Sequence, residues 1–194
     1  MNMRQVIKPI WYISRRTRSA ARYAFFRAFQ GAYFKSVGSG TKFFGRIRFG
    51  TVEGNISVGK NCMMGHELFL SATRKAVIEI GDDCSLNTGC HLVATDRISI
   101  GSGTRVGEYA SIRDQHHAFD DLSLPIHEQG FYGAPVVIGK NCWIGRGVII
   151  MAGVTLGDGC VVGANSVVTK SFGTNYIIAG VPAKPIRERG QTKP

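Results

Sequence analysis

The chain has 194 residues, of which 44% are hydrophobic, with 25 glycines and a formal net charge of +11. This length and composition predict one soluble domain and exclude a low-complexity chain. The longest uncharged run near the N-terminus, residues 9–14, is too short for a secretory leader or a spanning helix, so we expect a cytoplasmic protein.

Residues 1–51 form an N-terminal arm that carries all of the excess positive charge. Eleven Lys and Arg residues precede Glu53, the first acidic residue, whereas the rest of the chain has thirteen of each sign. Aromatic residues alternate with these cations, as in segments that lie at a membrane surface. We expect a basic, partly helical arm that contacts anionic membrane; the alternatives are a cap on the first coil or a plain basic surface. Without a recognisable binding motif, nucleic acid is not an expected partner.

Residues 52–173 show aliphatic residues at a period of six. The period is clearest at Ile138, Ile144, Ile150, Leu156, Val162 and Val168. This spacing fits neither a helix nor an alternating strand, so it predicts repeats of one short strand and one turn, stacked as a parallel β-helix. The period slips between Ala76 and Ile80 and between Ile98 and Ile100, where we expect small loops or altered turns.

The period stops between Ile112 and Ile138, which lie 26 residues apart where one repeat needs six. Residues 113–136 are therefore predicted to leave the coil as a long loop. This loop holds His116, His117 and His127. Loops that extend from a rigid scaffold commonly carry functional residues.

The five cysteines share one position of the repeat, four residues after an aliphatic residue. They are Cys62, Cys84, Cys90, Cys142 and Cys160. Metal sites and disulfide frameworks use paired spacings such as C-x-x-C, which the sequence lacks. We therefore expect buried structural thiols at the corners of the coil and no metal.

Three motifs in the C-terminal half belong together: Trp143-Ile-Gly, Val167-Val-Thr-Lys and Ala179-Gly-Val-Pro-Ala-Lys. With them, residues 50–187 resemble the hexapeptide-repeat acyltransferases, in particular the branch of maltose, galactoside and polysaccharide O-acetyltransferases. The resemblance implies an all-β, left-handed parallel β-helix, acetyl-CoA as donor, and a homotrimer with active sites between subunits. Residues 174–194 would complete the CoA site. Left-handed crossovers are rare, and the spacing alone does not determine the hand.

The resemblance also implies catalytic residues. In the resembling enzymes a catalytic histidine stands five residues beyond the last aliphatic residue of the coil, often three residues before an aspartate. In this chain that residue is His117, followed by Asp120. An imidazole with a pKa of about 6.5 can accept the proton of a sugar hydroxyl that attacks a thioester. An active-site asparagine thirty residues before the histidine corresponds to Asn87.

Further contacts follow from the same resemblance. Asp114 and Trp143 are expected to bind the acceptor with Asn87, and a backbone N–H near Arg146 is expected to bind the oxyanion. Small polar residues are common in the relatives at position 146, so the arginine is a departure. The expected CoA contacts, whose basic members suit phosphate groups, are Arg146, Ala164, Thr169, Lys170, Lys184 and Arg187.

Other classes of protein share this coil. A γ-type carbonic anhydrase needs three zinc-binding histidines, two of them five residues apart, and no pair here has that spacing. A non-catalytic β-solenoid scaffold would explain the coil but not the spacing of His117 and Asn87. We therefore expect an acetyl-CoA-dependent O-acetyltransferase acting on a cell-surface polysaccharide or its lipid-linked precursor. A small free sugar or an antibiotic stays open as the acceptor.

Overall fold

The computed structural model of the chain describes residues 31–73 and 75–191. Expectations for residues 1–30, including most of the basic arm, lie outside the described residues. The described part is almost entirely β-structure, with short 3-10 helices at η2 (Gly31–Tyr33) and η3 (Ile126–Glu128). Among these residues no helix has the length and apolar character needed to cross a membrane.

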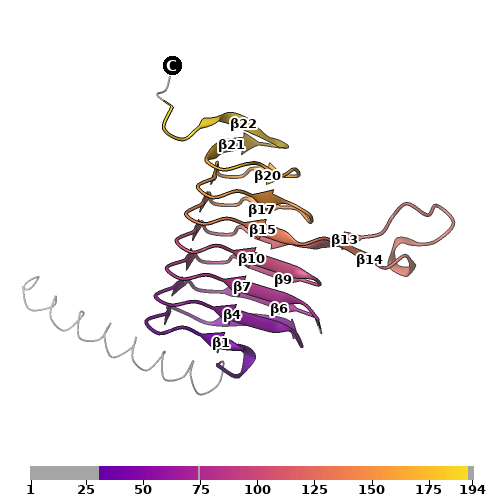
Figure 1. Cartoon of the computed structure of the whole chain (residues 1–194). Helices are drawn as coiled ribbons and strands as arrows, with labels where there is room; N and C mark the ends of the chain where they lie inside the picture. Colours follow the sequence, from indigo (N-terminus) through magenta and orange to yellow (C-terminus); the bar gives the residue numbers. More distant parts are fainter. Residues whose placement is uncertain (1–30, 74, 192–194) are drawn as a thin grey trace, which may run out of the picture.

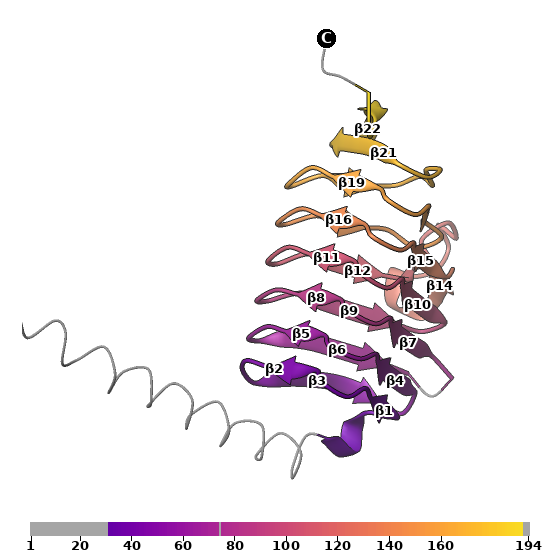
Figure 2. The same ribbon diagram turned by 60° about the vertical axis from the view of Figure 1, so that its left-hand side comes forward.

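Three sheets, parallel except for one antiparallel pair at the C-terminal end, wrap the chain into a three-sided coil (Figures 1 and 2). Face A consists of β1 (Ser36–Val37), β4 (Asn55–Val58), β7 (Val77–Ile80), β10 (Arg97–Ile100), β15 (Val136–Ile138) and β18 (Thr155–Leu156). Face B consists of β2 (Lys42–Phe43), β5 (Met63–Met64), β8 (Ser85–Leu86), β11 (Arg105–Val106), β16 (Trp143–Ile144), β19 (Val161–Val162), β21 (Tyr176–Gly180) and β22 (Ala183–Glu188). Face C consists of β3 (Ile47–Val52), β6 (Leu68–Ala72), β9 (His91–Ala94), β12 (Ser111–Arg113), β17 (Ile149–Ile150) and β20 (Val167–Val168).

The six-residue period is the stacking of equivalent inward side chains. On face B, for example, Leu86, Val106 and Ile144 follow one another in register and are fully buried. Each such residue removes an aliphatic side chain from water, which stabilises the fold by about 1.5–3 kcal/mol. The predicted all-β parallel β-helix is thus confirmed.

The slips of the period coincide with longer connections from face C to face A. From Leu70 to Ile80 the chain takes ten residues, and from Leu92 to Ile100 it takes eight, whereas the regular connection from Ile150 to Leu156 takes six. Two inward residues in one strand are not the cause, because the regular strand β15 also buries both Val136 and Ile138. Altered turns, one of the two expected causes, therefore account for the slips.

The coil also begins earlier and ends later than the predicted boundaries of 52 and 173. Strands β1, β2 and β3 form a complete first coil, in which Phe43 stacks in register on Met64. Phe43 stands where the other coils have an aliphatic residue, so the period of aliphatic residues does not include the first coil. At the other end, Ile178 of β21 continues the stack of face B and is fully buried.

All five cysteines are free and buried, as predicted. Four of them lie where face A turns into face B, whereas Cys90 lies where face B turns into face C. Thr41 and Thr104 occupy the same stack as the first four. Thr104 donates to Gly139 O at 2.9 Å and Cys142 donates to Gly157 O at 3.3 Å, so both residue types serve one role as small donors to the next coil.

The long insertion is a hairpin, not an irregular loop. Strand β13 (Gln115–His117) pairs antiparallel with β14 (Phe131–Gly133), and the hairpin projects sideways from the stack (Figure 1). It leaves the coil after β12 and returns at β15, so it replaces the turn between face C and face A.

Candidate functional site

The expected site residues are divided between two corners of the coil. The turns from face B to face C, which we call the BC corner, hold Asn87, Arg146 and Ala164 on three coils. The turn from face C to face A, the CA corner, carries the hairpin with His117. Within one chain the structure therefore brings the first three residues to one edge, and it places His117 at another.

Backbone N–H groups at the BC corner are available for a ligand. At the corner between faces A and B, the N–H groups of Lys60, Asp82 and Lys140 donate to side chains of the next coil, at 2.7–3.1 Å, whereas those of Ser102 and Asp158 have no acceptor among the described residues. At the BC corner, the corresponding N–H groups find no acceptor among the described residues. They belong to Glu108, Arg146 and Ala164. Unpaired donors aligned along an edge can bind carbonyl oxygens or a developing oxyanion.

Asn87 is the side chain at the start of this row. In four of the other five turns of the BC corner the equivalent position is glycine (Gly65, Gly107, Gly145 and Gly163), where an added Cβ atom would collide with the next coil, and in the first coil it is Phe44. Asn87 is exposed and donates from Nδ2 to Glu108 Oε1 at 3.3 Å. That bond leaves the amide oxygen of Asn87 as an acceptor for a ligand.

Two residues of this corner were missed by the sequence reasoning. Glu108 orients Asn87, and Tyr109 supports the guanidinium of Arg146, which lies 5.7 Å from the ring centroid. Tyr109 has φ = 59° and is 59% exposed, a costly conformation for a bulky residue. The sequence did contain a sign of this unusual residue: Tyr109 occupies the position of the repeat at which the adjacent coils have Gly89 and Gly147, both with positive φ.

The two adjacent histidines lie opposite aromatic residues in the hairpin. His117 faces Phe131, with ring centroids 4.3 Å apart, and His116 faces Tyr132 at 5.7 Å. Both imidazoles are exposed. Successive residues of a strand point to opposite sides, so each histidine serves a different surface of the hairpin.

Asp114 does not have the position expected of an acceptor-binding residue. Its carboxylate is fully buried and accepts bonds from Thr95 N at 2.8 Å, Thr95 Oγ1 at 3.1 Å and Asp96 N at 2.8 Å. A carboxylate with these partners has no free lone pair directed to solvent. The aspartate instead fastens the foot of the hairpin to the preceding coil, and we correct its expected role accordingly.

The expected CoA contacts lie along the C-terminal half. Thr169 and Lys170 are exposed at the CA corner, and Lys184 is exposed on β22. Arg187 is half-buried, and its Nη1 donates to Glu188 O at 3.1 Å and Gln191 O at 2.8 Å, so part of its donor capacity is used internally. Trp143, expected to contact the acceptor, is 60% exposed on face B.

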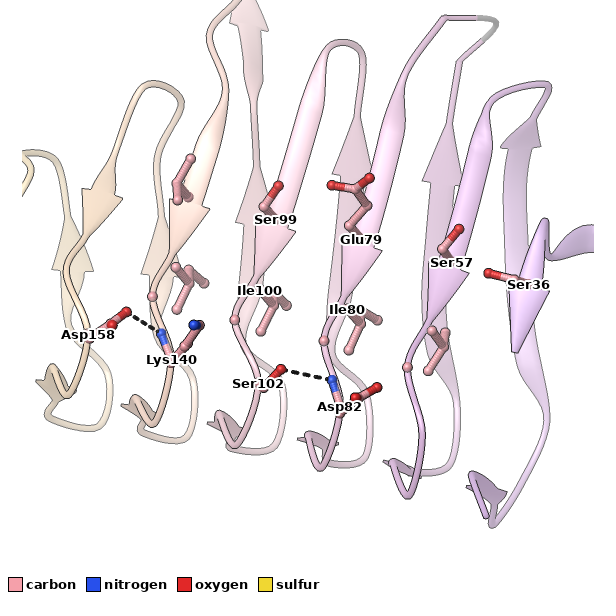
Figure 3. A pocket seen from close by; sticks show the side chains of 17 residues that line it. Ser36, Ser57, Glu79, Ile80, Asp82, Ser99, Ile100, Ser102, Lys140 and Asp158 are labelled. Carbon is pink, nitrogen blue, oxygen red and sulfur yellow. Dashed lines mark hydrogen bonds between the residues drawn. The ribbon is translucent and has the colours of Figure 1, made fainter. Parts of the chain in front are cut away.

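A separate open groove runs across face A. Its lining combines serines such as Ser36, Ser57 and Ser99 with the acidic Glu79 and Asp82 and with aliphatic residues and glycines (Figure 3). None of the expected catalytic residues lines it. Nor do the residues described by the structure contain three or more His, Cys, Asp or Glu side chains grouped to hold a metal ion.

Comparisons with known proteins agree with this architecture. Residues 135–170 match the family described as bacterial transferase hexapeptide (six repeats). The chain is 35% identical over 143 residues to a protein of Escherichia coli (strain K12) that carries the name lipopolysaccharide biosynthesis O-acetyl transferase WbbJ. The match covers 70% of this chain and 73% of that one. It is 32% identical to the galactoside O-acetyltransferase of the same organism, covering 68% and 63% of the two chains.

A solved structure shares the fold. It is a mutant of AntD, an N-acyltransferase from Bacillus cereus, in complex with dTDP-4-amino-4,6-dideoxyglucose and coenzyme A. The TM-score is 0.72 with 22% sequence identity, over 85% of this chain and 89% of that one.

Proposed function

Because the chain belongs to the family of bacterial hexapeptide-repeat transferases, we propose that it moves the acetyl group of acetyl-CoA to a hydroxyl of a sugar. The relatives named as O-acetyltransferases support the reaction and the sugar acceptor. The CoA complex of AntD supports the donor. The row of unpaired N–H groups at the BC corner is the observation that carries the proposal, because acyl transfer needs such donors.

His117 is the general base in this proposal. Its exposed imidazole accepts the proton of the acceptor hydroxyl while the hydroxyl oxygen attacks the thioester carbon. The tetrahedral intermediate collapses with cleavage of the carbon–sulfur bond. The imidazolium then returns its proton to the leaving thiolate of CoA, which regenerates neutral His117 and leaves an acetyl ester.

The BC corner supplies the electrostatic part of the reaction. The N–H of Arg146 stabilises the oxyanion, and the N–H of Ala164, one coil further along, binds a carbonyl of the pantetheine arm. Asn87, held by Glu108, accepts a hydrogen bond from the acceptor or from an amide of CoA. Lys170, Lys184 and Arg187 contribute positive charge for the phosphates of CoA.

The separation of the two corners supports a trimer as the working unit. His117 lies at the CA corner and Asn87 at the BC corner of one chain, on opposite edges of face C. A cyclic arrangement of three copies can bring the CA corner of one subunit to the BC corner of the next, which completes three equivalent sites.

We also propose a polysaccharide or its lipid-linked precursor as the acceptor, with the protein at the cytoplasmic face of the membrane. The relative named for lipopolysaccharide biosynthesis supports the first point. The second rests on the charge and aromatic content of residues 1–51.

The proposal is tested by incubating the full chain with acetyl-CoA and a panel of glycans, nucleotide sugars and small alcohols, with products identified by mass spectrometry. Acetylated sugar is the expected product. The absence of acetyl transfer to every acceptor, with CoA binding intact, would favour a non-catalytic solenoid.

A further inference from the structure

Arg146 and Tyr109 form a cation–aromatic pair at the BC corner. The guanidinium carbon of Arg146 lies 5.7 Å from the centroid of the Tyr109 ring, which belongs to the preceding coil. That ring in turn extends back over Gly89, because a Cβ atom added there would lie 2.5 Å from Tyr109 Cδ1. Gly89 belongs to the turn that carries Asn87. The pair therefore directs the guanidinium back along the corner, toward Asn87.

This direction separates the guanidinium from the residues proposed for the phosphates of CoA. Lys170 follows β20 and Lys184 lies on β22, both after the coil of Arg146. Tyr109 and Asn87 lie on the coils before it, which end in β12 and β9 (Figure 2). The backbone N–H proposed to bind the oxyanion lies between the two sets. In the proposed function, the side chain of Arg146 is therefore on the side of the thioester that faces the acceptor.

No carboxylate of the described residues neutralises the charge of Arg146. Neither of the two ion pairs among these residues involves its guanidinium, which also donates no hydrogen bond to any of them. Glu108, at the equivalent position one coil earlier, is instead bonded to Asn87 at 3.3 Å. Residues 1–30 contain no Asp or Glu. The contact with the ring uses none of the N–H donors, so the planar fork of the exposed guanidinium is available for an anion.

Tyr109 holds its place at a cost in backbone conformation. Its φ of 59° lies in the left-handed region, which disfavours a bulky residue. The side chain is 59% exposed, so burial in the core does not offset this cost. The contact of its ring with Arg146 is the interaction that gives an aromatic residue a use at this position.

We propose that Arg146, held by Tyr109, binds the carboxylate of an acidic sugar and thereby selects uronic acid residues as acceptors. This inference rests on the proposed function and names its acceptor class. The guanidinium donates two parallel N–H bonds to the carboxylate, a pairing that fixes orientation as well as adding affinity. The hydroxyl groups of the same sugar then lie beside the N–H row where acyl transfer is proposed. Arg146 is thus a specificity-determining residue, and Tyr109 is a positioning residue.

Isothermal titration calorimetry of the full chain at saturating CoA tests the proposal with two probes, the methyl glycosides of galacturonic acid and of galactose. They differ only in having a carboxylate or a hydroxymethyl group. We expect the acidic probe to bind about tenfold more tightly or better, and Arg146→Ser, which keeps the backbone N–H, to bring the two affinities within about twofold. Arg97→Ser is the matched control, because Arg97 is an exposed arginine on face A that pairs with Glu79. It should keep the full preference.

Two substitutions of Tyr109 test its positioning role. Tyr109→Phe keeps the ring and should retain the preference for the acidic probe. Tyr109→Gly removes the ring and should reduce the preference by about threefold or more. Glycine adopts a positive φ without strain, so Tyr109→Gly should unfold at about the same temperature as the wild type. Retention of the full preference in Tyr109→Gly would overturn the positioning role.

Several outcomes would overturn the role of Arg146. They are no measurable binding of the acidic probe, equal affinities of the wild type for both probes, and a preference that survives in Arg146→Ser. A loss of CoA affinity of similar size in Arg146→Ser would overturn it too, because the guanidinium would then serve the donor. So would an Arg146-dependent preference for succinyl-CoA over acetyl-CoA, which would assign the carboxylate to the acyl group. These are binding measurements, so they stand apart from any failure to observe acetyl transfer.

Discussion

The imidazole of His117 packs against the phenyl ring of Phe131, with 4.3 Å between the ring centroids. The two residues are directly opposed on antiparallel strands, so the pairing of β13 with β14 holds the histidine in place. An isolated surface loop would leave the same side chain free to rotate. The hairpin therefore restricts the orientation of the proposed base before substrates bind.

His117→Ala should reduce acetyl transfer by about a hundred to ten thousand fold, the usual loss when a general base is removed. The variant should still fold and bind CoA, because the imidazole is exposed. His116→Ala is the matched control and should have a milder effect, since His116 lies on the other side of the hairpin. Turnover within a few-fold of wild type in the His117 variant would exclude this residue as the base.

Mixed trimers of His117→Ala and Asn87→Ala should regain activity. Each variant alone is expected to be impaired, but if one subunit supplies the histidine and its neighbour the asparagine, random mixing leaves about a quarter of the sites intact. Co-refolding the two variants at equal concentration and assaying acetyl transfer measures this fraction. No gain over the separate variants would place both residues in sites of one subunit, and a fully active monomer in analytical ultracentrifugation would contradict the trimer.

Gly107→Ala should destabilise the coil at the BC corner. A Cβ atom at position 107 would lie 2.6 Å from the backbone nitrogen of Arg146, which cannot move without disturbing the stack. We expect a loss of about 1–3 kcal/mol in the free energy of unfolding, as for other overpacked sites, together with reduced acetyl transfer. Gly173→Ala is the control, because its added Cβ meets nothing closer than 3.5 Å. Equal unfolding midpoints for the two variants would be inconsistent with this geometry.

Asp114→Ala should loosen the hairpin. The substitution removes the acceptor of the N–H groups of Thr95, which is half-buried, and of Asp96, which is exposed, so we expect a loss of about 0.5–1.5 kcal/mol for each hydrogen bond. Limited proteolysis should then cut within residues 118–130 faster than in the wild type. Asp120→Ala, an exposed aspartate of the same hairpin, serves as the control and should show wild-type cleavage rates. Unchanged cleavage in Asp114→Ala would show that the carboxylate does not anchor the hairpin.

Stability should fall at alkaline pH in part through Cys90. Burial raises the pKa of its thiol from 9.0 to about 12, so the folded state holds the proton more tightly than the unfolded state. The resulting stabilisation is complete below pH 9 and is lost as pH rises from there toward 12. Urea unfolding between pH 7 and 11 should show a smaller decline in Cys90→Ala than in the wild type. Identical slopes would mean that this thiol does not contribute.

The spacing of the repeat predicted the position of the hairpin, but it did not predict the role of Asp114. The interruption after Ile112 predicted where the chain leaves the coil, because a missing repeat is visible as a count of residues. The anchoring role of Asp114 was not predictable. Its partners, Thr95 and Asp96, lie on the preceding coil, and only the stacking of coils places them beside it.

The sequence by itself determined the parallel β-helix, because inward aliphatic residues at a period of six can be buried only by stacking on their equivalents in the next coil. Only the tertiary structure decided which corner each functional residue occupies. The turn that carries Asn87 keeps the six-residue period, whereas the hairpin that carries His117 interrupts it, and the two lie on opposite edges of face C. The connections from face C to face A before β7 and β10 are longer than the regular one, so a count of residues alone does not give the corner at which a residue lies. The bond from Asn87 to Glu108 and the unpaired N–H of Arg146 depend on that alignment between coils, which no single repeat contains.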